Sequence, residues 1–119
     1  MEAFNLESLA RHHEALNQRW AEFLRVDSLS AGIYRLPAGE TDLQRPHAED
    51  EIYFVIRGKA ILRVGDEERP VAPGDLLYVP RNADHRFFNI SEDLVLLVVF
   101  APAEGTAERH EEHEREAGV

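Results

Sequence analysis

Apolar residues recur every three or four positions near the start of the chain, between residues 5 and 24. This spacing places them along one face of a helix, with charged and amide side chains on the other faces. Asn5 precedes the pattern and has a side chain suited to capping a helix. We therefore predict an amphipathic helix over residues 5–24. The positions on its mostly apolar face are Leu6, Leu9, His13, Leu16, Trp20 and Phe23 or Leu24.

After Asp27 the period of the apolar positions changes to two, and turn-forming residues follow every eight to twelve positions. Such runs, rich in β-branched and aromatic residues, predict short strands. With two shorter segments at 43–47 and 69–71, about eight strands are expected, and a small chain of this kind folds as a sandwich or barrel. The longer runs are 28–36, 51–57, 59–64, 75–80, 85–90 and 93–100.

The segment from Leu94 to Phe100 is apolar at every position. A strand with two apolar faces is either central between two layers or part of a subunit interface. Because Trp20 and Phe23 add further large apolar side chains on the predicted helix, we expect a homodimer.

The chain has 119 residues and a formal charge of −10, with no cysteine. This length predicts one folded unit, which we divide into a helical extension at 1–26, a barrel at 27–102 and a charged tail at 103–119. The charge argues against a nucleic-acid or membrane partner. No apolar run is long enough to cross a bilayer, and no secretion signal opens the chain, so a cytoplasmic location is expected.

The stretch RPHAEDE, residues 45–51, concentrates ionisable side chains and is either a solvated turn or half of a metal site. On one straight strand His47 and Glu51 would lie roughly 13 Å apart, too far to share an ion. A hairpin that folds back through residues 48–50 instead makes them cross-strand neighbours, about 5 Å apart at Cβ. In that arrangement Glu49 and Asp50 are expected to face water.

Two spaced motifs in this chain resemble those of the cupin family. The first is a glycine, a histidine pair, a glutamate and a second glycine, and all of its spacings are kept. The second follows after a gap of fifteen residues, with an asparagine in the place of one glycine. The resemblance implies an all-β fold, the double-stranded β-helix or jelly-roll barrel, with the predicted α-helix preceding it. The matching positions are Gly39, Arg45, His47, Glu51 and Gly58, then Gly74, Pro80, Asn82, His85 and Asn89.

Arg45 stands where the family has the first histidine of the pair, and a guanidinium does not ligate metals. The resemblance therefore implies a metal site of His47, Glu51 and His85. Two imidazoles and one carboxylate suit a divalent transition metal such as Fe, Mn, Ni, Cu, Co or Zn. The alternative is a degenerate barrel whose pocket holds no metal.

Three further residues are candidates for substrate binding. Arg45 is either an anion clamp beside the metal or a surface arginine paired with a nearby acid. Tyr53 and Phe87 share the inward-facing parity of the expected ligands, which makes them pocket-wall residues.

The resemblance implies a small metal-binding protein with a small, anionic organic ligand in its barrel. Open coordination positions suit dioxygenase or isomerase chemistry. A non-catalytic binding or sensor module remains the alternative, because the fold alone does not choose between them. No catalytic residue is assigned.

Overall fold

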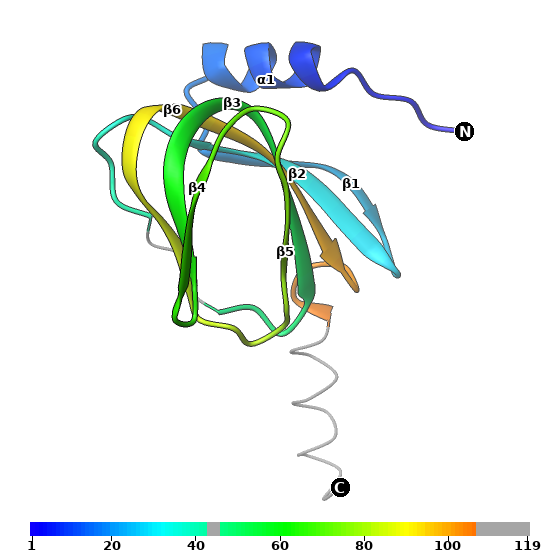
Figure 1. Cartoon of the computed structure of the whole chain (residues 1–119). Coiled ribbons are helices and arrows are strands. Elements are labelled where there is room, and N and C mark those ends of the chain that lie inside the picture. Colours follow the sequence, from blue (N-terminus) through cyan, green and yellow to red (C-terminus); the bar gives the residue numbers. More distant parts are fainter. Residues whose placement is uncertain (43–45, 107–119) are drawn as a thin grey trace, which may run out of the picture.

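The computed structural model describes residues 1–42 and 46–106. A helix, α1 (Leu6–Ala15), precedes six strands, β1 (Trp20–Val26), β2 (Leu29–Leu36), β3 (Asp50–Val64), β4 (Glu67–Val71), β5 (Leu76–Val79) and β6 (His85–Ala101). All pairings between these strands are antiparallel, in the order β1-β2-β6-β3-β4, with β5 pairing to β3. The strands curl around a common interior, and α1 lies across their outside (Figure 1).

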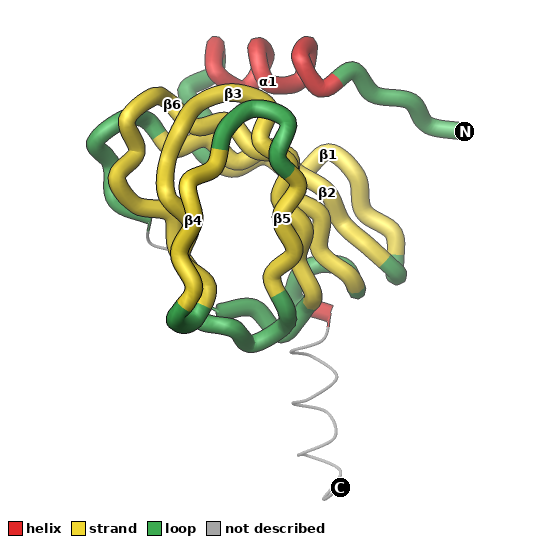
Figure 2. Tube along the Cα trace, in the orientation of Figure 1, coloured by secondary structure: helices red, strands yellow, loops and turns green. Residues whose placement is uncertain are grey.

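The longest strands, β3 and β6, pair along both of their halves (Figure 2). Register shifts between Val55 and Ile61 mark the bend between the two halves. Gly58 lies there with a φ of 97°, a conformation that disfavours any side chain. The two strands predicted at 51–57 and 59–64 are therefore one strand, because the chain bends through bulges while β3 continues. For the same reason, the segments predicted at 85–90 and 93–100 form one strand.

The interior of the barrel is filled by alternate side chains of the paired strands. Along β6, Leu94, Leu96, Val98 and Phe100 are buried on the inner face. The apolar run 94–100 is central, because this half of β6 pairs with β2 on one side and β3 on the other. On its outer face, Val95 packs with Ile33 of β2 and Ala10 of α1.

The predicted helix over 5–24 is too long. Asn5 caps α1 as expected, accepting a hydrogen bond from the Ser8 amide at 2.9 Å, but the helix ends at Ala15. Asn17 then takes a left-handed conformation, with a φ of 53°. Trp20–Val26 pairs with β2 as a hairpin, so strand pairing overrides the helical spacing.

The short strand predicted at 69–71 is confirmed as part of β4. Of the strand predicted at 43–47, residues 43–45 lie outside the described residues, and residues 46 and 47 belong to no strand. Among the described residues, no helix is long and apolar enough to cross a membrane.

Candidate metal centre

The side chains of His47, Glu51 and His85 meet inside the barrel. Each offers one ligand atom, and the three atoms lie within 4.8 Å of one another. Glu51 is the second residue of β3, His85 opens β6, and His47 lies in the loop before β3. The predicted proximity of His47 and Glu51 is confirmed.

The hairpin expected to bring them together is wrong, because His47 belongs to no strand. Its carbonyl instead accepts a hydrogen bond from the Asn82 amide at 2.6 Å, which ties the His47 loop to the β5–β6 loop. Asn82 has a φ of 63°, a left-handed conformation that asparagine tolerates. This explains how it stands in the place of a motif glycine.

His85 is oriented by hydrogen bonds on both ring nitrogens. Nδ1 lies 2.9 Å from the Ala83 carbonyl, which only accepts, so Nδ1 carries the proton. Nε2 then carries the lone pair that could bind a metal. It lies 3.3 Å from Glu51 Oε1 and 3.1 Å from the Tyr53 hydroxyl. Fixing one imidazole nitrogen by a backbone carbonyl is how proteins present the other nitrogen to a metal.

Burial lowers the pKa of His85, but the adjacent Glu51 carboxylate and the Ala83 carbonyl outweigh it. The pKa of His85 is therefore raised. Without a metal, a proton on Nε2 takes the position beside the carboxylate that a metal cation would take.

The remaining ligand atoms are buried without hydrogen-bond partners. Both oxygens of Glu51 and Nε2 of His47 have none. The Glu51–His85 contact at 3.3 Å brings opposite charges close but lacks hydrogen-bond geometry. Buried polar atoms without partners are costly and uncommon in a folded protein. Two imidazole nitrogens and a carboxylate aimed at one point fit a divalent transition metal.

Tyr53 and Phe87 are buried in the interior, as their strand parity predicted. Their rings meet edge to face, with centroids 5.0 Å apart. Tyr53 contacts His85 through its hydroxyl, so it lies against the candidate ligands. Their role in binding a substrate stays a prediction, and Arg45 lies outside the described residues.

A cavity of about 180 Å³ adjoins His47. Sequence reasoning missed most of its walls, because it placed Trp20 on a helix and Glu104 in a charged tail. The lining residues are Trp20, Tyr34, His47, Val98, Phe100 and Glu104. No local pattern marks Glu104, although the β-propensity of the segment around Trp20 was a usable signal for β1.

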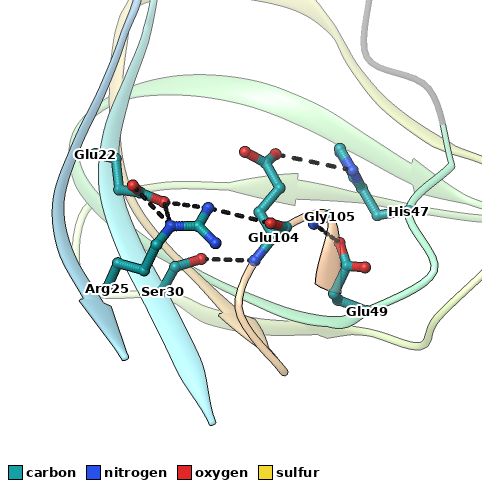
Figure 3. Close-up of polar contacts among 7 residues, drawn as sticks. All are labelled: Glu22, Arg25, Ser30, His47, Glu49, Glu104 and Gly105. Atoms are coloured by element: carbon teal, nitrogen blue, oxygen red, sulfur yellow. Dashed lines mark hydrogen bonds and ion pairs between the residues drawn. The ribbon is translucent and has the colours of Figure 1, made fainter. Parts of the chain in front are cut away.

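Glu104 points toward His47, with Oε2 4.0 Å from Nδ1 (Figure 3). Burial raises the pKa of Glu104; His47 works against this, while Glu49, Glu22 and Glu51 add to it. The expectation that Glu49 faces water is wrong, because its side chain is buried and accepts a hydrogen bond from the Gly105 amide at 3.2 Å. Long-range packing of residues 103–106 covers a side chain that the local sequence leaves exposed.

Comparisons with known proteins agree with this architecture. The Cupin domain family model matches residues 32–100. An uncharacterized protein from Streptomyces coelicolor is 48% identical over 104 residues, which make up 87% of this chain and 99% of that protein. An acireductone dioxygenase from Bacillus mycoides is 35% identical over 66 residues, or 50% of this chain and 38% of that enzyme.

A solved structure from Methanocaldococcus jannaschii, described as an RmlC-like cupin family protein with a double-stranded β-helix fold, matches with a TM-score of 0.66. The two sequences are 21% identical, and the match covers 77% of this chain and 84% of that one. The predicted all-β fold, a double-stranded β-helix with an N-terminal helix, is thereby confirmed.

Proposed function

We propose that this chain, which belongs to the Cupin domain family, binds a divalent transition metal and holds a small organic ligand beside it. The metal ligands in this proposal are His47, Glu51 and His85. The observation that carries it is the convergence of three ligand atoms within 4.8 Å, with both Glu51 oxygens and His47 Nε2 lacking a hydrogen-bond partner.

Each of these residues has a definite part in such a site. Glu51 supplies the negative charge, and His85 is held in the tautomer that leaves Nε2 available. The Tyr53 hydroxyl lies 3.1 Å from the same nitrogen, so Tyr53 stands next to the proposed metal and its ligand. A divalent metal bound here supplies Lewis-acid chemistry and open positions for a ligand or O₂.

The cavity beside His47 sets the size of the organic ligand. At about 180 Å³ it is smaller than the roughly 300–1,000 Å³ typical of drug-sized ligands. Oxygenase or isomerase activity is the finer part of the proposal, and the acireductone dioxygenase relative supports testing oxygenation first. The anionic ligand inferred from the sequence depends on Arg45 and stays a prediction.

Metal binding is tested on untagged protein by metal analysis and by titrating the metal-free chain with Zn²⁺, Mn²⁺ and Co²⁺. We expect one ion per chain and loss of binding in His47→Gln. The matched control is His12→Gln, which changes an exposed histidine on α1. Equal affinities for wild type and His47→Gln contradict the ligand set.

Catalysis is tested separately, by measuring oxygen consumption and isomerisation with the metal-loaded chain over a panel of small ketones, diketones and carboxylates. Turnover that disappears in His47→Gln supports an enzyme. Metal binding without turnover favours the non-catalytic binding or sensor module.

A further inference from the structure

The cavity beside His47 has aromatic walls. The Trp20 ring meets Tyr34 with centroids 6.4 Å apart at 69°, and Phe100 with centroids 6.1 Å apart at 74°. Rings set at such steep angles form a corner, so a small group in the cavity contacts more than one ring. Space for the indole depends on Gly32, because a Cβ there would lie 2.8 Å from Trp20 Cζ2.

Among the described residues that line the cavity, no lysine or arginine stands beside the three rings. The Tyr34 hydroxyl donates to Asp42 at 2.9 Å, so this residue offers its ring to the cavity while its polar atom is engaged elsewhere. Among the described lining residues, the carboxylate belongs to Glu104.

Glu104 is held in this position by its backbone. Its amide donates to Ser30 Oγ at 2.9 Å, and its carbonyl accepts from Arg25 at 3.1 Å (Figure 3). The next amide, of Gly105, donates to the buried Glu49 at 3.2 Å. Contacts from β1, β2 and the loop before β3 therefore fix the segment, and the carboxylate is directed to the cavity wall and His47.

The charges around the cavity are mainly negative. Glu104, Glu49, Glu51 and Asp42 contribute four carboxylates near it. A divalent ion at Glu51 offsets two of these charges. Two arginines lie nearby, and each is paired with an acid: Arg25 with Glu22 at 2.8 Å, and Arg19, which acts on Tyr34, with Glu40 at 3.0 Å. An anion entering this cavity meets repulsion from the described walls, whereas a cation is attracted.

We propose that this cavity binds the cationic group of a small organic molecule, such as a quaternary ammonium, between Trp20, Tyr34 and Phe100. Glu104 is its counter-charge. Aromatic rings attract such cations electrostatically, and the attraction strengthens where water is excluded. This inference deepens the proposed function, because the cation belongs to the organic ligand held beside the metal.

The test compares three probes of similar shape by titration calorimetry near neutral pH. Choline carries a trimethylammonium group, 3,3-dimethylbutan-1-ol replaces its nitrogen with carbon, and 3,3-dimethylbutanoate ends in a carboxylate. We expect wild type to bind choline about tenfold more tightly than the alcohol. Glu104→Gln should reduce this ratio to about threefold or less, because it keeps the size of the side chain and removes its charge.

Glu92→Gln is the matched control, since it removes one carboxylate from an exposed site on β6, where Glu92 lies 3.9 Å from Lys59. It should keep the wild-type preference. Trp20→Leu should weaken choline binding by about fivefold and affect the alcohol less. If Trp20→Leu does not fold, the test rests on the choline preference of Glu104→Gln, whose position is partly exposed.

Equal binding of choline and the alcohol to wild type, or tighter binding of the carboxylate, overturns the inference. So does a choline preference that Glu104→Gln leaves unchanged. Repeating the titrations with metal-free and Zn²⁺-loaded protein separates the two proposals. A chain that keeps the cation preference but binds no metal refutes only the metal site, and a chain that binds metal without the preference refutes only the cation site.

Discussion

At a pH well above the raised pKa of His85, where that imidazole is neutral, replacing Glu51 with glutamine should stabilise the metal-free protein while weakening metal binding. The Glu51 side chain is 1% exposed, and neither oxygen has a hydrogen-bond partner. Glutamine keeps the shape, removes the buried charge and places an amide donor near His85 Nε2, which lies 3.3 Å from Oε1. Relieving an unsatisfied buried acceptor is worth about 1–3 kcal/mol. For a chain of this size, the expected rise in Tm is roughly 4–12 °C.

Metal affinity should change in the opposite direction. Loss of a residue that only supports a metal ligand costs about 10–100-fold in affinity, so loss of the carboxylate ligand itself should exceed about 100-fold. The two assays are thermal unfolding of the metal-free protein and calorimetric titration with Zn²⁺, with Glu92→Gln as the control for removing one negative charge. A Glu51→Gln protein that unfolds earlier than wild type, or that keeps wild-type metal affinity, refutes this reasoning.

Three further predictions concern pH, backbone and assembly. Metal occupancy should fall with pH as the histidine ligands protonate. Because the pKa of His85 is raised, metal release should begin above about pH 6.5. Equal occupancy at neutral and acid pH would exclude histidine ligands. Gly58→Ala should destabilise the fold by about 1–3 kcal/mol in denaturant unfolding, because the new Cβ would lie 2.6 Å from Leu94 Cα. The control Gly65→Ala should cost less, because no atom lies within 4 Å of its Cβ. Sedimentation should show a homodimer that Tyr78→Glu disrupts, because Leu76 and Tyr78 are large exposed side chains on the outer face of β5. A wild-type chain that stays monomeric at high concentration would count against the dimer.

Much of the barrel was predictable from the sequence because its information is local. Alternation of apolar and polar residues defined the strands, and it placed Tyr53 and Phe87 on the inward face. The resemblance to the cupin motifs implied the set of His47, Glu51 and His85, whose ligand atoms lie within 4.8 Å of one another in the structure. Glu51 and His85 lie at the start of β3 and β6, as the strand pattern implies, whereas His47 lies in a loop that the Asn82 amide ties to the β5–β6 loop.

Only the tertiary structure decided which other groups surround that site. Residues 20–24 fit the helical spacing, but pairing with β2 makes them a strand and turns Trp20 over Gly32. Glu49 and Glu104 are 55 positions apart in the sequence and both look like surface acids. The segment after β6 packs against the loop before β3, which buries Glu49 and directs Glu104 to the cavity. Contacts between distant segments leave no periodic trace in the sequence, because their energy depends on the closure of the whole barrel and not on neighbouring residues.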